Sequence, residues 1–408
     1  MNKKNILFIS YDGMTDPLGQ SQVIPYLIGL SKHGYQFTIL SCEKPARFAT
    51  GKSKVEKILE PYPIKWTPIP YHKKPPVLSS VYDVATLKRK ARKLHFEEEF
   101  DMVHTRAGVP ALIGLWMKKK IGVKFLHDVR EFYADSRIEG GMWNYDNFFY
   151  KKIYNYFKKK EKEEIKFSDG MVCLTYAAEK IIKEWPGYKG QMLEVIPCSV
   201  DMSIFDPGKI SVGQKATLKR ELNIYENDFV ISYLGSIGGW YLTDEMLQFC
   251  KIISDKIPNA KFLFISPHEP EIILEKAGKY GIEKNKIIVK NAQRNEVPLL
   301  LSLSNYSIFF IKPCFSKQSS SPTKHGEIMA MGIPVITNPG VGDVADIVER
   351  YKSGMVIKDL NKENYLAYSE IICRTGFDSD KIRDGAKEFY SLDNAVKKYL
   401  KVYDHILR

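Results

Sequence analysis

Short apolar runs alternate with helical segments along the whole chain, and this alternation limits the possible folds more than any other feature of the sequence. In the first half the runs are residues 5–10, 36–40, 101–104 and 124–127; in the second half they are 229–235, 261–265, 286–289, 306–311 and 334–337. Brief apolar runs between helical segments are typical of parallel strands that are buried on both faces. The sequence therefore predicts an α/β protein with two Rossmann-like domains.

A proline-rich passage separates the two alternating regions, and its composition is typical of a hinge between domains. We therefore expect an N-terminal domain at residues 1–205 and a C-terminal domain at 206–390. Residues 391–408 carry apolar side chains at helical spacing, which predicts a last helix with a face to bury. That helix is expected to pack on one of the two domains, with a crossing back to the first as one of the two placements.

The chain is basic, and most of the excess charge lies in its first half. It has 61 Lys and Arg against 48 Asp and Glu, a net charge of +13. Residues 1–205 contribute 33 basic and 23 acidic side chains, whereas residues 206–408 contribute 28 and 25. Such a balance favours a polyanionic or anionic-surface partner. The basic runs lack aromatic residues at the spacing of a nucleic-acid module, so nucleic acid is not the expected partner.

Other compositional features predict a cytoplasmic protein without a metal site. The six cysteines are spread along the chain with no C-x-x-C pair, which argues against both a zinc site and a disulfide framework. The first apolar run is too short for a signal peptide, and no stretch approaches the roughly 18 apolar residues of a membrane span.

The most informative stretch is Ser319 to Ile336, in which a loop of small residues leads into a helix. Ser321 and Pro322 fit an N-cap and a first helical position. The amides at a helix N-terminus bind phosphate well, and Lys324 adds a positive charge there. Glu327 lies one turn further and suits acceptance from two vicinal hydroxyls, as in a ribose. The alternative is an exposed Lys–Glu pair worth about 0.2–0.5 kcal/mol.

The string Lys324-x-x-Glu327-x-x-Ala330-x-Gly332-x-Pro334-Val335-Ile336 resembles the donor-binding signature of retaining glycosyltransferases of the GT-B fold, in particular family 4. The resemblance implies two Rossmann-like domains with parallel sheets facing a cleft. It implies a nucleotide-diphosphate sugar as co-substrate, with no metal and no other cofactor. In that family a Glu-x7-Glu pair ends at this glutamate, but Ser319 stands where the first glutamate would fall. The sequence therefore resembles the subset that lacks it.

Candidate site residues follow the strands, because ligands of open α/β sheets bind beyond the carboxyl ends of the strands. With the resemblance, the predicted catalytic residues are His127, Asp128, Lys324 and Glu327. The predicted donor-binding residues are Gly19, Gly235, Ser236, Arg294, Ser321, Thr323, Lys324 and Glu327. The predicted acceptor-side residues are Asp12, Gln20, Arg106 and Arg130. Many family members carry an Arg and a Lys after the first strand of the second domain, and this sequence has neither there.

Each of these residues also has an ordinary structural interpretation. A histidine at a sheet edge, such as His104 or His127, is more often packed and hydrogen-bonded than catalytic. Arg106 and Arg130 are as easily explained by ion pairs with nearby carboxylates. The glycine-containing loop after the first strand has no G-x-G-x-x-G pattern, so it is weak evidence by itself and argues against a dinucleotide site.

Taken with the resemblance, the sequence predicts a retaining glycosyltransferase of hexosyl or N-acetylhexosaminyl type that acts in bacterial surface polysaccharide synthesis. Its expected partners are a nucleotide sugar and a saccharide or lipid-linked saccharide acceptor. The basic runs Lys88–Lys93 and Lys151–Lys160 are candidates for peripheral contact with an anionic membrane, at the inner face of the cell membrane. Two alternatives remain open: a nucleotide-sugar epimerase of similar fold, and a non-catalytic protein that binds membranes or polyanions.

Overall fold

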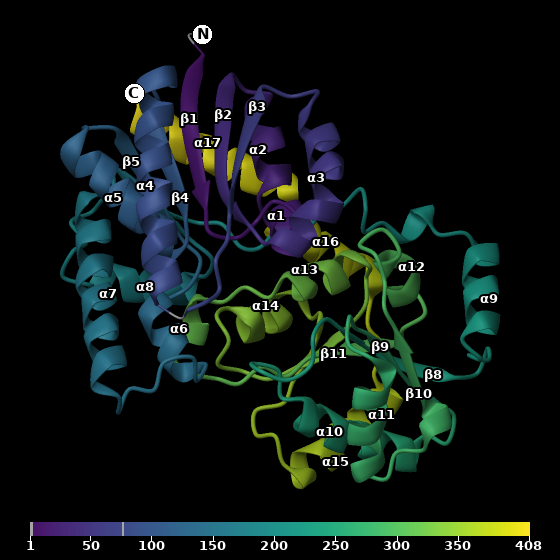
Figure 1. Ribbon diagram of the computed structural model, residues 1–408. Helices are drawn as coiled ribbons and strands as arrows, with labels where there is room; N and C mark the ends of the chain where they lie inside the picture. The colour runs from purple at the N-terminus through teal and green to yellow at the C-terminus, as the bar shows by residue number, and fades with distance from the viewer. Residues whose placement is uncertain (1–2, 76) are drawn as a thin grey trace. The chain divides into compact units, whose positions relative to one another are not determined.

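The computed structural model describes residues 3–75 and 77–408 and divides into two compact units (Figure 1). The N-terminal unit comprises the chain up to Ser199 together with Leu392–Arg408, and the C-terminal unit comprises Val200–Ser391. Backbone hydrogen bonds mark the point at which the chain passes from one unit to the other. The Ser199 amide donates to the Tyr26 hydroxyl at 2.8 Å, whereas the next amide, that of Val200, donates to the Tyr390 carbonyl at 2.8 Å.

A seven-stranded parallel sheet forms the centre of the N-terminal unit, in the order β3-β2-β1-β4-β5-β6-β7. Its strands are β1 (Lys4–Ser10), β2 (Tyr35–Glu43), β3 (Ile64–Pro70), β4 (Met102–Arg106), β5 (Lys124–Val129), β6 (Gly170–Cys173) and β7 (Met192–Val195). Its helices are α1 (Pro17–Gln22), α2 (Ile24–Ser31), α3 (Pro45–Leu59), α4 (Leu78–Glu98), α5 (Gly108–Lys120), α6 (Tyr133–Glu139), α7 (Phe148–Phe167), α8 (Tyr176–Glu184) and α17 (Leu392–Leu407).

A second parallel sheet, of six strands in the order β10-β9-β8-β11-β12-β13, forms the centre of the C-terminal unit. Its strands are β8 (Phe229–Leu234), β9 (Ala260–Ile265), β10 (Ile287–Lys290), β11 (Tyr306–Ile308), β12 (Val335–Thr337) and β13 (Gly354–Val356). Its α-helices are α9 (Val212–Glu221), α10 (Thr243–Lys256), α11 (Pro270–Lys279), α12 (Val297–Leu301), α13 (Thr323–Ala330), α14 (Val344–Tyr351), α15 (Lys362–Arg374) and α16 (Ser379–Tyr390). The prediction of two Rossmann-like α/β domains with parallel sheets is confirmed.

Four strands were not predicted from the apolar runs, and their sequences explain why. β3 reads Ile-Lys-Trp-Thr-Pro-Ile-Pro, in which two prolines and a lysine interrupt the apolar pattern. Proline cannot donate to a sheet, and it is tolerated here because β3 lies at the sheet edge. β7 lies at the other edge and is only partly buried, while β6 and β13 are very short.

The last helix, α17, packs against the N-terminal unit, which is one of the two placements left open by its sequence. Its apolar face belongs to the same core cluster as β1, β2 and α2. Val402 and Tyr403 on this face are fully buried. Gly170 of β6 leaves the space that this helix needs, since a Cβ there would lie 2.8 Å from Ile406 Cδ1.

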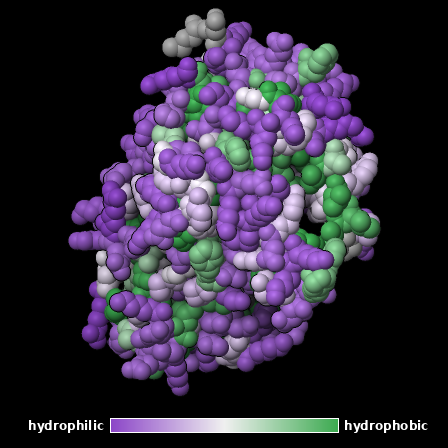
Figure 2. All heavy atoms as spheres, turned by 90° about the vertical axis from the view of Figure 1, so that its left-hand side faces the viewer, coloured by the Kyte–Doolittle hydropathy of each residue, from purple (hydrophilic) through white to green (hydrophobic). Residues whose placement is uncertain are grey.

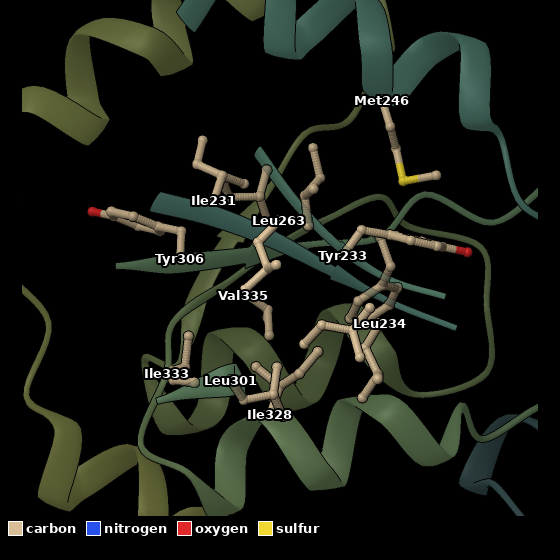
Figure 3. Close-up of a cluster of buried hydrophobic side chains, with 14 of the residues drawn as sticks. Ile231, Tyr233, Leu234, Met246, Leu263, Leu301, Tyr306, Ile328, Ile333 and Val335 are labelled. Carbon is tan, nitrogen blue, oxygen red and sulfur yellow. The ribbon is translucent and has the colours of Figure 1, made fainter. Parts of the chain in front are cut away.

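The core of the C-terminal unit holds α13 against the sheet. Figure 3 shows Ile328 and Leu301 pointing from their helices toward the strands that carry Ile231, Leu263 and Val335. Ile328 and Val335 are fully buried. This packing fixes the position of α13, the helix that carries Lys324 and Glu327.

None of the helices in the described part of the chain combines the length and the apolar character that crossing a membrane requires.

Candidate functional site

The strand order of the C-terminal unit predicts a ligand site near the start of α13. The order reverses between β8 and β11, and open α/β sheets bind ligands beyond the carboxyl ends of the strands at such a reversal. The loop after β8 contains Gly235 and Ser236, and the chain after β11 leads to α13. Seven of the eight predicted donor-binding residues, all except Gly19, therefore lie in the unit where a ligand site is expected.

Helix α13 begins one residue later than predicted. Pro322, with φ −66° and ψ 117°, occupies the N-cap, and Thr323 is the first helical residue. Ser321 was expected at the N-cap, but it lies in the chain just before it. The reason is that the fixed φ of proline is compatible with the extended backbone of an N-cap as well as with a first helical turn. Thr323 and Ser321 are half-buried beside the helix N-terminus.

Lys324 is buried in an aromatic environment. Its Nζ lies 3.7 Å from the ring centroid of Tyr241 and 4.4 Å from that of Tyr233, and it donates to the Tyr233 hydroxyl at 3.3 Å. Only 7% of the residue is exposed. Burial lowers the pKa of Lys324 to about 7, although Glu327 opposes the shift. A buried cation with a displaced pKa is the kind of group found at functional sites.

Gly235 makes room for this lysine. Its φ is +119°, and a Cβ at this position would lie 2.9 Å from Lys324 Nζ. A side chain would therefore be strained and would displace the ammonium group. The neighbouring Ser236 carbonyl accepts from the Tyr233 hydroxyl, so the same tyrosine contacts both the glycine loop and the lysine.

Glu327 and Arg294 form an ion pair, with 2.7 Å between Arg294 NH1 and Glu327 Oε1. Burial raises the pKa of Glu327, while Arg294 and Lys324 counteract this effect. The Arg294 guanidinium also lies 5.3 Å from the ring centroid of Phe205. The structure thus brings together Lys324, Glu327, Arg294 and Gly235, which we name the α13 site.

Sequence reasoning missed Tyr233 and Tyr241 at the α13 site. Both flank the glycine loop in the sequence, Tyr233 before it and Tyr241 after it. The only available signal was the position of two aromatic residues around a loop expected to approach a ligand. That signal does not say which way the rings point.

In the N-terminal unit the strand order reverses between β1 and β4, and there the structure pairs two predicted acceptor-side residues. Arg106, at the end of β4, donates from NH1 to Asp12 Oδ2 at 2.9 Å. Gln20 instead donates to the Thr15 carbonyl of its own loop at 3.3 Å. Gly19 is packed internally, because a Cβ there would lie 2.2 Å from the Gly13 carbonyl oxygen. That contact explains the need for glycine without a ligand.

Asp128 and Arg130 belong to a buried network with α17. Arg130 Nε donates to Asp128 Oδ2 at 2.9 Å, and the Tyr399 hydroxyl donates to the same oxygen at 2.9 Å. Arg130 NH2 in turn donates to the Tyr399 hydroxyl at 2.6 Å. Burial alone would raise the pKa of Asp128, but Arg130 and His104 outweigh it and hold that pKa below its usual range. This geometry favours a structural role for the pair.

The two histidines of this edge have different surroundings. His104 Nδ1 lies 2.8 Å from the Tyr403 hydroxyl, so it is a packed and hydrogen-bonded histidine. His127 is also buried, and its Nδ1 has no hydrogen-bond partner among the described residues. Burial lowers the pKa of His127 to about 4. Its Nε2 lies 3.9 Å from Glu164 Oε2.

No group of three or more His, Cys, Asp or Glu side chains within residues 3–75 and 77–408 is arranged to hold a metal ion.

Two protein-family models match the chain, one for each unit. The Glycosyltransferase Family 4 model matches residues 23–204, and the Glycosyl transferases group 1 model matches residues 214–388. A comparison with curated protein sequences finds no match.

Many solved structures share the fold over nearly the whole chain. A glycosyltransferase from Rickettsia africae has a TM-score of 0.70 and 17% identity, with 100% of both chains covered. The Anabaena protein Alr3699/HepE in complex with UDP-glucose has a TM-score of 0.70 and 12% identity, with 98% of this chain and 99% of that one covered. A Listeria monocytogenes protein with a proposed UDP-N-acetylglucosamine 2-epimerase activity has a TM-score of 0.59 and 13% identity, covering 98% and 95%.

The two sheets, their strand orders and these structural relatives define the GT-B fold. Because the two family models together account for most of the chain, it is a glycosyltransferase made of a family 4 domain followed by a group 1 domain.

Proposed function

We propose that this glycosyltransferase is a retaining enzyme. It transfers a hexosyl or N-acetylhexosaminyl group from a nucleotide-diphosphate sugar to a saccharide or lipid-linked saccharide acceptor in bacterial surface polysaccharide synthesis. The observation that carries the proposal is the α13 site, where a buried lysine at a helix N-terminus lies beside the Arg294–Glu327 pair. The UDP-glucose complex of the Anabaena relative supports the donor class.

In this proposal the diphosphate of the donor binds at the start of α13. The amides of the first helical turn and the Lys324 ammonium supply positive charge, and Ser321 and Thr323 supply hydroxyl donors. The loop of Gly235 and Ser236 lets backbone amides approach the phosphates. Neither a metal ion nor another cofactor is part of this binding mode.

Glu327 is proposed to accept hydrogen bonds from vicinal hydroxyls of the ribose. Arg294 holds one oxygen of the carboxylate, Oε1, and so fixes its orientation. A carboxylate that is already oriented loses less conformational entropy when the nucleotide binds.

Ser319 replaces the first glutamate of the family motif, and we propose that the chain belongs to the subset without it. The Ser319 hydroxyl donates to the Ser316 carbonyl at 2.7 Å, which stabilises a local turn. Lys324 then takes over part of the polar contact with the donor.

Retention is proposed to proceed by displacement on the front face of the sugar. The bond from the anomeric carbon to the donor phosphate oxygen breaks, the acceptor oxygen bonds to the same face, and the departing diphosphate takes the acceptor proton. Lys324 and the helix N-terminus stabilise the charge that develops on the diphosphate, which is often the largest contribution to catalysis. His127, neutral at pH 7, orients the transferred sugar through a hydrogen bond.

On the acceptor side, the Asp12–Arg106 pair is proposed to contact the acceptor together with Gln20. Asp128 and Arg130 are proposed to act indirectly, because their polar atoms already bond to each other and to Tyr399.

A thermal-shift screen against UDP, GDP, ADP and their sugars tests the proposal, because a ligand that binds the native state raises the melting temperature. We expect one nucleotide and its sugar to raise it. No shift with any of them would overturn the proposal. Incubation with the donor alone provides a second test, since an isomerised nucleotide sugar without acceptor would identify an epimerase.

The basic runs on α4 and α7 are proposed to bring the enzyme to an anionic membrane at the inner face of the cell membrane. Within the α7 run, Lys158 pairs with Asp135 and Glu161, and Lys160 pairs with Glu163. The uncompensated charge of this run therefore lies mainly on Lys151, Lys152 and Lys159. Binding to phosphatidylglycerol vesicles should be lost when Lys88–Lys93 and Lys151–Lys160 are both reversed in charge. Vesicle binding without any nucleotide affinity would instead identify a non-catalytic membrane protein.

A further inference from the structure

Helix α4 begins with an exposed apolar stripe. Leu78, Val81 and Tyr82 are 68%, 61% and 57% exposed. Their spacing of three and four residues places them on one face of the helix. Most of the surface in Figure 2 is hydrophilic, and hydrophobic side chains gather in only a few places on it. Exposed apolar side chains that adjoin one another, unlike those scattered singly, are a feature of interaction sites.

The opposite face of the same turns carries a buried carboxylate. Asp83 is only 1% exposed, and its oxygens accept from three donors. The Tyr11 hydroxyl donates at 3.0 Å, the His72 amide at 3.1 Å, and the His72 ring from Nδ1 at 2.6 Å. The usual pattern, apolar inward and polar outward, is thus inverted at the start of α4. These hydrogen bonds satisfy the buried carboxylate and fix the position of His72 beside the helix.

The contact with Asp83 also orients His72. With Nδ1–H donating to the carboxylate, Nε2 faces away from it. No described residue bonds to Nε2, and the His72 side chain is 43% exposed. The imidazole and Tyr82 rings are in edge contact, with centroids 5.2 Å apart. A positioned ring nitrogen therefore lies directly beside the apolar stripe.

Positive charge adjoins the histidine. Lys73 and Lys74 follow it in the chain and are exposed, and neither forms an ion pair with a described residue. All three residues come just after β3, at the carboxyl edge of the sheet where ligands of α/β proteins bind.

We propose that His72, Lys73, Lys74, Leu78, Val81 and Tyr82, which we name the α4 surface, bind an anionic amphiphile with a phosphate head and a hydrocarbon chain. His72 and the lysines contact the phosphate, and the apolar stripe contacts the chain. The role of this amphiphile in the reaction rests on the proposed function: it is the lipid-linked acceptor of the sugar, and the acceptor is not a free saccharide. An oriented imidazole at the substrate edge favours one bound molecule over general contact with a bilayer.

Calorimetric titration with n-decyl phosphate, kept below its micelle-forming concentration, tests the proposal. The wild-type protein should bind it at least tenfold more tightly than inorganic phosphate, which has no chain, and n-decanol, which has no charge. Equal affinity for n-decyl phosphate and n-decanol would overturn the role of the phosphate.

A triple variant with Leu78→Ser, Val81→Ser and Tyr82→Ser should lose at least tenfold in affinity for n-decyl phosphate. Because these side chains are exposed, the variant should fold, which its melting temperature reports. The matched control is Val212→Ser in the C-terminal unit, where the replaced side chain is 85% exposed. Wild-type affinity in the triple variant would overturn the proposal.

His72→Gln should weaken binding of n-decyl phosphate severalfold and leave binding of n-decanol unchanged. A membrane surface also presents phosphate groups and hydrocarbon chains, and binding to phosphatidylglycerol vesicles tests for it. If the triple variant loses vesicle binding while wild-type protein does not bind monomeric n-decyl phosphate, the surface contacts a membrane and the proposal is wrong. Nucleotide affinity, measured on the same samples, separates this outcome from failure of the proposed function.

Discussion

Both units carry buried charged residues near the carboxyl edge of their sheet, but the partners of these residues differ between the two units. In the N-terminal unit, Asp128 and Arg130 bond to each other and to the Tyr399 hydroxyl. In the C-terminal unit, the buried Lys324 has two aromatic rings and one tyrosine hydroxyl around it, and the nearby carboxylate of Glu327 is bonded to Arg294.

This difference distinguishes charged residues that stabilise the fold, such as Asp128 and Arg130, from charged residues that are available to bind a ligand, such as Lys324. A buried ion pair with good hydrogen bonds holds its surroundings in place, and removing one partner is costly. A buried cation without a carboxylate bonded to it destabilises the folded protein, and a bound anion would offset that cost. The same residue types at equivalent edges therefore hold α17 in place in one unit, and in the other they form the site at which we propose that an anion binds.

The largest expected effect is on turnover. Lys324→Ala and Glu327→Ala should each reduce sugar transfer at least about tenfold, because each removes a group that contacts the donor in the proposed mechanism. Lys358→Ala, which removes an exposed lysine of the same unit, is the matched control and should leave transfer unchanged. Near wild-type transfer by both variants would contradict the assignment of the α13 site.

The affinity for a nucleoside diphosphate should depend on pH through Lys324. Burial lowers the pKa of Lys324 to about 7, and a bound anion would raise it. Above pH 7 binding then requires proton uptake, so affinity should fall by up to about tenfold per pH unit. The other charged groups at the site are Glu327 and Arg294, and they remain in the Lys324→Met variant. Calorimetry at several pH values should show a flatter profile for that variant.

Lys324→Met should also stabilise the protein without ligand. The folded-state pKa of Lys324 lies below the ordinary value of 10.5, so folding disfavours its charged form. This cost is present in full below about pH 7 and disappears as pH rises toward the unfolded-state pKa. The melting temperature of the variant should exceed that of the wild type most clearly at pH 6. An unchanged or lower melting temperature of the variant at pH 6 would show that burying the charged Lys324 does not destabilise the folded protein.

Tyr399→Phe tests whether the network of Asp128, Arg130 and Tyr399 stabilises the N-terminal unit. The change removes one hydrogen bond from Asp128 and one from Arg130, both buried, and should lower the free energy of unfolding by about 1–3 kcal/mol. Tyr156→Phe, at a half-exposed tyrosine of the same unit, serves as control. Denaturant unfolding measures the change. Nucleotide affinity should stay constant. A loss of nucleotide affinity without a loss of stability would show that Tyr399 and its partners serve ligand binding and do not mainly stabilise the fold.

The smallest expected effect concerns the ring of Tyr241. Tyr241→Leu removes a cation–π contact worth about 0.5–2 kcal/mol, which favours the charged form of Lys324. The pH midpoint of nucleotide binding should therefore move to lower pH by about 0.4–1.5 units. Tyr241→Phe keeps the ring and should keep the midpoint. A midpoint that moves equally in both variants would point to the hydroxyl instead.

Much of the fold was predictable from the sequence, because a buried parallel strand requires a continuous apolar run. The runs at 5–10 and 229–235 correspond closely to β1 and β8. β3 was not predictable in this way, since its prolines are acceptable only at an edge, and strand order is not visible in the sequence. The start of α13 was displaced by one residue because proline suits both positions.

The sequence by itself determined the two-domain α/β architecture and the grouping of Lys324 with Glu327 on one helix, because these depend on local periodicity and spacing. Its resemblance to a glycosyltransferase signature was also present in the sequence alone. Tertiary structure alone decided which charged residues are bonded within the fold. Asp128 and Arg130 meet Tyr399, which is far away in the sequence, and Lys324 meets the rings of Tyr233 and Tyr241. The protonation and availability of a charged group depend on its burial and on partners that only folding brings together.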